Sequence, residues 1–178
     1  RRARLHDPAV ERTWGRLFSD AGRVYRPAQS RYFVGATPAP CLGAGDATGP
    51  FYCADNRTLY FDLMLFAALP AQLREIEDQA TKLIIASVAA APALDQLGAT
   101  SDPANVDCLA GVWARDAAER IGPVPTDRYG LAIQGTRRIA EARASWWAGG
   151  PAMPGGLDQG STAEREAAFR RGYAAGVI

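Results

Sequence analysis

Residues 49–63 of this chain read GPFYCADNRTLYFDL, and this stretch decides the local fold. Two runs rich in aromatic residues, 51–53 and 59–61, flank the turn-forming residues 54–57. Aromatic runs on either side of such a turn predict a β-hairpin. Another aromatic run at residues 32–34 predicts a further strand.

Most of the remaining chain has the spacing of amphipathic helices. Asp7-Pro8 and Asp102-Pro103 each place a capping residue before a proline, which suits the first position of a helix. A capping-box pattern begins at Ser161. Apolar residues at helical spacing then predict five helices: 8–20, about 70 to 92, 103–121, 126 to about 145, and 162 onward.

Prolines and glycines set the expected ends of these helices. Pro92 is expected to end or kink its helix because proline lacks the amide hydrogen. Gly122-Pro123 is expected to stop the next helix, and residues 149–160, with five glycines and two prolines, read as a loop. The sequence predicts one α+β domain, mainly helical, over residues 1–178.

Composition excludes several classes of function. Twenty basic residues oppose nineteen acidic ones, for a net charge of +1, and no basic stripe suited to a nucleic acid is visible. The longest apolar run, residues 83–94, is shorter than the ~20 residues that span a membrane. The chain begins at Arg1 without a methionine, so we expect an N-terminal signal or membrane anchor to be missing from it.

Three cysteines carry little catalytic signal. Cys41 and Cys53 flank a glycine-rich stretch that leads into the hairpin, which predicts a disulfide if the compartment is oxidising. Two reduced, buried cysteines are the alternative. Cys108 is expected to be a small apolar residue on a buried helix face.

Familiar catalytic machinery is absent from the sequence. The single histidine, His6, lies near the start of the chain, and no G-x-S-x-G or phosphate-binding glycine motif occurs. Cys108 therefore lacks an imidazole that could activate it. Trp146-Trp147 are expected to pack in the core or beneath the glycine-rich loop, with an exposed glycan- or lipid-binding surface as the alternative.

Three blocks of sequence resemble the neutral zinc metallopeptidase family of bacteria. Residues 49–63 are similar to its "GPFYCPADQKVYLDL" block, with Cys41 at the place of a preceding cysteine. Residues 107–114, DCLAGVWA, resemble "ADCFAGVWA", and residues 160–173 resemble "GTSAQR…FRRGF". The resemblance implies a zincin-like metallopeptidase fold with a small β-sheet, and a location outside the bacterial cytoplasmic membrane, either tethered or secreted.

The metal-binding motif of that family has no counterpart here. Between the first two blocks the family carries "AHEVGHH", whose histidines bind zinc and whose glutamate is the general base. The corresponding residues here, 84–92, read IIASVAAAP. An ungapped comparison places Ser87 and Ala91 at the two histidines and Val88 at the glutamate, followed by Ala89 and Ala90.

Two other polar positions implied by the resemblance are also changed. The third-ligand glutamate falls on Pro103, and a histidine before the last block falls on Gln159. Of the polar residues near the site, Asp107 remains. We therefore expect no catalytic residues, no metal and no cofactor.

The resulting hypothesis is a catalytically inactive, metallopeptidase-like domain of the cell envelope that binds a peptide or protein partner. The hairpin is the expected binding edge, with Tyr60, Phe61, Asp62 and Leu63, together with Asp107, as binding residues.

Two alternatives remain open from the sequence alone. One is a hydrolase or peptidase without histidine chemistry, using Asp62, Asp107 or Cys108. The other is the glycan- or lipid-binding module at Trp146-Trp147. Convergence of the first three side chains in one open pocket would favour the enzyme.

Overall fold

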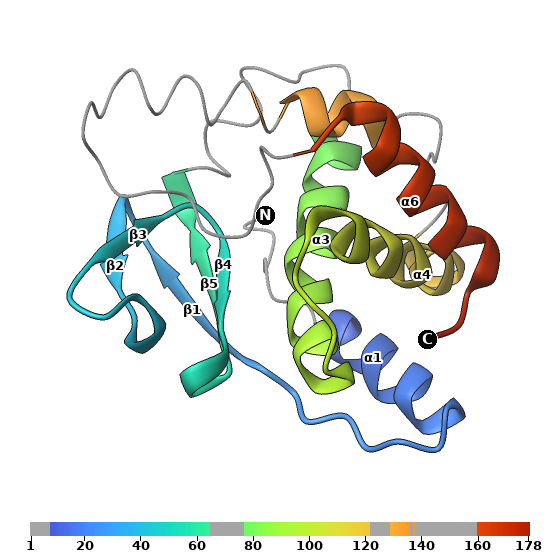
Figure 1. Ribbon diagram of the computed structural model, residues 1–178, viewed down its shortest axis with the longest axis horizontal. Coiled ribbons are helices and arrows are strands. Elements are labelled where there is room, and N and C mark those ends of the chain that lie inside the picture. Colours follow the sequence, from blue (N-terminus) through green and yellow to red (C-terminus); the bar gives the residue numbers. More distant parts are fainter. Residues whose placement is uncertain (1–7, 65–76, 122–128, 136, 138–159) are drawn as a thin grey trace.

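The computed structural model describes residues 8–64, 77–121, 129–135, 137 and 160–178. Figure 1 shows the strands gathered on one side of the molecule and the helices on the other. The fold is thus a mixed α+β fold, as predicted. No helix in the described part of the chain is long and apolar enough to cross a membrane. The single-domain organisation stays a prediction.

Three strands form the main sheet, in the order β1 (Gln29–Phe33), β5 (Thr58–Asp62), β4 (Phe51–Cys53). β5 is parallel to β1 and antiparallel to β4. The predicted hairpin is therefore confirmed, and β1 contains part of the strand expected at 32–34. A second, two-stranded sheet pairs β2 (Ala36–Pro38) with β3 (Asp46–Thr48).

The hairpin turn is a short 3-10 helix, η2 (Ala54–Asn56), closed by Arg57 with a φ of 49°. All residues of β5 are buried, because both faces of this middle strand are covered. On one face Tyr60 stacks on Phe51 with ring centroids 4.6 Å apart. On the other, Leu59 and Phe61 join the main core beside the helices.

The Cys41–Cys53 disulfide is present, with the two Cα atoms 5.6 Å apart. It joins a second 3-10 helix, η1 (Pro40–Leu42), to the end of β4. The alternative of two reduced cysteines does not hold in this structure. Cys108 is free and half-buried, less covered than the sequence suggested.

The first helix, α1 (Pro8–Asp20), has the predicted bounds. Trp14, Leu17 and Phe18 recur at helical spacing and are buried. They belong to one contiguous core with side chains of the later helices.

Helix α3 (Glu77–Leu97) continues through Pro92, so the expectation that the helix ends there is wrong, whereas the alternative of a kink stays a prediction. Ala89, Ala90, Ala93 and Leu94 are buried on both sides of the proline. Their packing offsets the lost backbone hydrogen bond, because tertiary burial contributes more to a helix than local propensity does. The expected start of this helix, before residue 77, lies outside the described residues.

Helix α4 (Pro103–Ile121) begins at the predicted cap, where the Asn105 amide donates to Asp102 Oδ1 at 3.0 Å. The described part of α4 reaches Ile121, and the stop predicted at Gly122-Pro123 lies outside the described residues. Of the helix expected from 126 to about 145, residues 129–135 and 137 are described and helical.

Helix α6 (Thr162–Ala175) has the predicted capping box, with Ser161 and Glu164 each serving the other's backbone amide. It lies alongside α4 (Figure 1). The approach is close at two glycines: a Cβ on Gly111 would meet the carbonyl oxygen of Phe169, and one on Gly172 would meet that of Cys108. Two blocks of the family resemblance therefore meet at a helix crossing that requires glycine.

Candidate functional site

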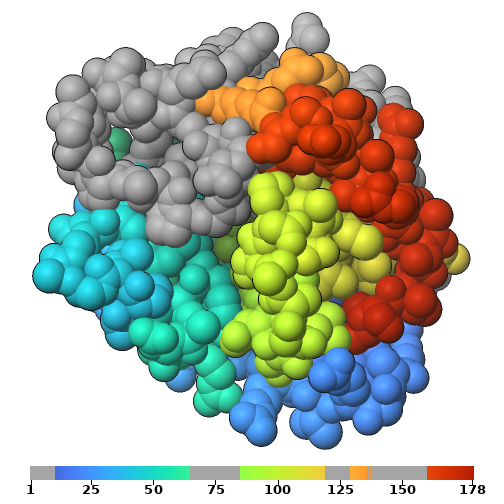
Figure 2. Space-filling model, viewed as in Figure 1, coloured from blue at the N-terminus to red at the C-terminus, as the bar shows by residue number. Residues whose placement is uncertain are grey.

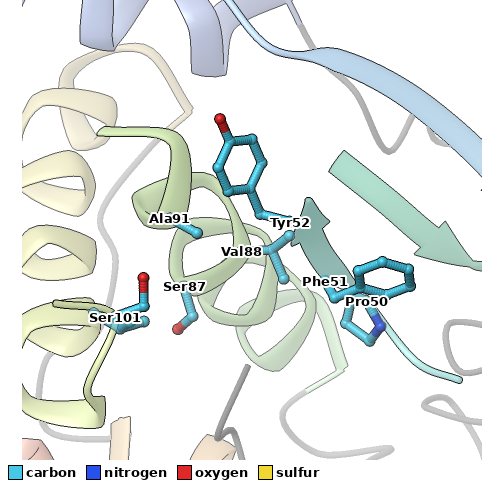
Figure 3. Close-up of a pocket in the computed structure, with 8 residues that line it drawn as sticks. Pro50, Phe51, Tyr52, Ser87, Val88, Ala91 and Ser101 are labelled. Carbon is cyan, nitrogen blue, oxygen red and sulfur yellow. The ribbon is translucent and has the colours of Figure 1, made fainter. Parts of the chain in front are cut away.

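A small cavity lies between α3 and β4. Ser87, Val88 and Ala91 of the helix line it together with Phe51 and Tyr52 of the strand, and Figure 3 shows Val88 on the side of the helix next to Tyr52. About 40 Å³ of this partly open space is accessible to water-sized molecules. In the space-filling view the teal surface of the hairpin lies beside the yellow-green surface of the helices (Figure 2).

The cavity lies where the family resemblance places the metal motif. Residues 87 and 91 are four apart and so share one face of α3. Val88 is their neighbour on the same cavity wall. The three positions that the resemblance implies for two metal ligands and a general base thus line one cavity, and their correspondence to the family's motif stays a prediction.

These residues do not fit a zinc ion. Zinc sites are built from imidazole, thiolate and carboxylate groups, and Ser87, Val88 and Ala91 supply none of them. No group of three or more histidine, cysteine, aspartate or glutamate residues suited to a metal occurs in the described ranges. Pro103 stands at the start of α4, and both Gln159 and His6 lie outside the described residues.

A buried polar chain begins at the cavity wall. Ser87 Oγ lies 3.4 Å from the Tyr129 hydroxyl, which in turn donates to Asp107 Oδ1. Arg165 donates two hydrogen bonds to the same carboxylate, from Nε to Oδ2 at 2.7 Å and from Nη2 to Oδ1 at 2.9 Å. Asp107 and Arg165 are 0% and 3% exposed, so this ion pair is almost completely shielded from water.

The electrostatics of these hydrogen-bonded side chains oppose proton transfer along them. Burial raises the pKa of Tyr129 far above its ordinary value, and the adjacent Asp107 charge raises it further. Burial alone would lower the pKa of Arg165, but its hydrogen bond to Asp107 and the charge of that carboxylate outweigh this and raise it. Tyr129 thus stays a neutral phenol and Arg165 stays charged. These hydrogen bonds link α4, α6 and the helical residues 129–135.

The Asp62 side chain is also fully buried, and its carboxylate is hydrogen-bonded to backbone amides. Its carboxylate accepts hydrogen bonds from the backbone amides of Gly35, Gly49 and Met64 at 3.4, 3.3 and 2.9 Å. These bonds hold the segments that follow β1 and β5 and precede β4. The aspartate thus has an architectural role in the hairpin region.

The predicted binding residues of the hairpin occupy the middle strand of the sheet. Tyr60, Phe61 and Asp62 are buried in β5, whereas Leu63 beyond its end is 40% exposed. The outer strand of the hairpin is β4, which has β5 as a neighbour on one side and α3 near the other. A partner that adds to this sheet edge would meet β4. Partner binding by these four residues and Asp107 stays a prediction.

The side chains proposed for non-histidine catalysis do not gather at the cavity. Neither Asp62, Asp107 nor Cys108 is among the described residues that line it. Both aspartates are held in buried hydrogen bonds, and the backbone of Cys108 packs against Gly172. These three side chains therefore do not share this cavity, and the enzyme alternative stays untested. Trp146-Trp147, the basis of the glycan or lipid alternative, lie outside the described residues.

Comparison with known proteins identifies the family. The sequence pattern of the family described as "putative neutral zinc metallopeptidase" matches residues 5–102 and 101–178. The chain belongs to this family.

Two proteins similar to this chain are both described as uncharacterized protein YpfJ. They come from Escherichia coli strain K12 and from strain CFT073 of serotype O6:H1. Each is 27% identical over 187 residues, which cover 94% of this chain and 65% of the relative. The chain thus spans about 65% of the length of these curated relatives. No solved structure gives a significant match.

Sequence reasoning identified Asp107 in the family's second block but missed its partners. Arg165 lies in the third block, and an arginine in a segment that resembles the family so closely was a usable signal. Tyr52 lies in the first block and carried the same kind of signal. Tyr129 lies outside the three blocks and gave no comparable signal, because its position relative to α3 depends on the packing of distant segments.

Proposed function

We propose that this chain is a catalytically inactive, zincin-like member of its metallopeptidase family that binds an extended segment of another protein in the bacterial cell envelope. One observation carries the proposal. The α3 face at the position of the family's metal motif presents Ser87, Val88 and Ala91 to a cavity next to an edge strand.

Inactivity follows from the chemistry of these side chains. A zinc peptidase needs a metal that lowers the pKa of bound water and a base that accepts its proton. A valine at residue 88 cannot accept a proton, and Asp107 is already neutralised by Arg165. Replacing unused polar ligands by small apolar residues also removes the cost of burying them without partners.

Binding of an extended segment is supported by the position of β4. An edge strand offers main-chain hydrogen bonds to an added strand, and this mode of recognition needs no metal. β4 lies at the edge of the main sheet, and Phe51 and Tyr52 also line the cavity. The hairpin edge named from the sequence is therefore kept, with β4 in place of β5.

The envelope location rests on the disulfide and on the family resemblance. Disulfides such as Cys41–Cys53 persist in oxidising compartments outside the cytoplasm. An oxidising location outside the cytoplasm fits both observations.

Metal content tests inactivity directly. The purified chain is incubated with excess zinc, the free ion is removed, and bound metal is measured by elemental mass spectrometry. We expect no stoichiometric metal and no hydrolysis of a casein substrate. A Ser87→His, Ala91→His variant is the positive control, since two imidazoles on one helical face should retain more zinc. One tightly held metal per wild-type chain would overturn the proposal.

Binding is tested separately, by fluorescence anisotropy with labelled, end-blocked peptides of strand-forming sequence. Saturable binding by the wild-type chain is expected. Absence of binding across a set of such peptides would contradict the peptide-binding half of the proposal and leave the metal result standing.

A further inference from the structure

Building on the proposed function, we propose that the cavity between α3 and β4 is a side-chain pocket for an uncharged aliphatic group of about three carbon atoms. The group belongs to the extended segment that adds to β4. The pocket occupies the position of the metal motif, so that a side chain takes the place of the ion.

The size of the cavity sets the size of the occupant. Its 40 Å³ of accessible space is enough for about three water-sized groups, at roughly 10–15 Å³ each. An isopropyl group, the side chain of valine, has three carbons of comparable size. A glycine would leave the space unfilled, and an aromatic ring would exceed it.

The charge of the lining sets the chemical class. The helix contributes Val88 and Ala91, and the start of α4 contributes Val106, while the two serines, Ser87 and Ser101, are uncharged. No charged side chain is found among the described lining residues. A lysine or glutamate side chain in this pocket would lose its hydration without gaining a partner.

The Tyr52 hydroxyl and the Asp107 carboxylate near the pocket already take part in hydrogen bonds within the protein. The Tyr52 hydroxyl donates to Asp95 Oδ2 at 3.0 Å, which holds the ring in place as a wall of the pocket. Behind the opposite wall, Asp107 is paired with Arg165, two hydrogen bonds beyond Ser87. The Asp107 charge is therefore neutralised by Arg165, and Asp95, which keeps its charge, is not among the described residues that line the pocket.

The adjacent strand sets the form of the occupant. In an extended segment, side chains two residues apart lie about 6.6–6.8 Å apart on the same side. A segment paired with β4 would present one such side chain to α3, because Tyr52 of β4 lines the same cavity as Val88. An isolated small molecule would lack these main-chain contacts.

The test uses three labelled, end-blocked heptapeptides, threonine-rich and identical except for valine, glycine or lysine at the centre. Anisotropy is measured with the wild-type chain, with Val88→Phe, which fills the pocket, and with Val24→Phe. Val24 is 86% exposed and provides the same substitution away from the pocket. Thermal melting confirms that each variant folds, and Ala91→Val is a milder filling variant if Val88→Phe does not.

The valine peptide is expected to bind wild type and Val24→Phe at least about tenfold more tightly than the glycine or lysine peptide. Filling the pocket should abolish this preference while weak binding of all three peptides remains. Equal affinities for valine and glycine in the wild type, or a preference retained in both filling variants, would overturn the pocket but leave edge-strand binding intact. Absence of binding by every peptide would overturn both the pocket and the peptide-binding half of the proposed function.

Discussion

Asp107→Asn should destabilise this protein severely although the substitution barely changes the shape of the side chain. The carboxylate accepts two hydrogen bonds from Arg165, at 2.7 and 2.9 Å, and one from Tyr129. Arg165 is only 3% exposed, so an uncharged amide leaves a buried guanidinium without its counter-charge. Removing one partner of a buried ion pair typically costs about 3–5 kcal/mol.

The matched control is Asp20→Asn. Asp20 also pairs with an arginine at 3.0 Å, but the side chains of Arg16 and Asp20 are 53% and 63% exposed. An exposed pair contributes at most about 1 kcal/mol, because water screens its charges. Two variants with the same chemical change should therefore differ by at least about 2 kcal/mol in unfolding free energy.

Urea unfolding followed by tryptophan fluorescence measures this difference, since Trp14 and Trp113 are buried in the core. A third variant, Asp107→Leu with Arg165→Met and Tyr129→Phe, removes the charges and both donors together. It should recover most of the lost stability, because both buried charges are removed together and Ser87 loses only its 3.4 Å contact with Tyr129. The reasoning fails if Asp107→Asn lies within about 1 kcal/mol of Asp20→Asn.

Three further predictions concern other parts of the fold. Burial raises the pKa of Glu11, although hydrogen bonds from Tyr25 and the Ala28 amide partly oppose this. The folded state therefore binds a proton at Glu11 more tightly than the unfolded state does, and the stability that this proton contributes is lost as pH rises through the raised pKa. Glu11→Gln should thus stabilise the chain at pH 7 but not near pH 4, as urea midpoints at the two pH values would show. An equal effect at both pH values would count against this. Gly172→Ala should lower the melting temperature by several degrees because the new methyl meets the carbonyl of Cys108, whereas no change would mean that α4 and α6 separate freely. Replacing both Cys41 and Cys53 by serine should cost about 3 kcal/mol in urea unfolding, from the loss of loop closure, and an unchanged midpoint would show that the disulfide contributes nothing.

The position of β4 at the sheet edge, with β5 in the middle, shows why the proposed binding edge was only partly predictable. The hairpin itself was readable, because its turn and aromatic runs are local. Which of its strands forms the sheet edge depends on β1, which pairs with β5 although the two are separated by more than twenty residues. Nothing in residues 29–33 indicates which side of the hairpin they join.

Local chemistry was enough to predict the capped starts of α4 and α6 and the hairpin turn. Each depends on residues within one or two turns of chain, whose backbone donors and acceptors are satisfied nearby. Tertiary structure decided that α3 continues through Pro92 and that β5 lies in the middle of the sheet. It also decided the hydrogen-bonded chain that runs from Ser87 through Tyr129 and Asp107 to Arg165. In these cases the stabilising groups come from segments far apart in sequence, and only packing brings them within contact distance.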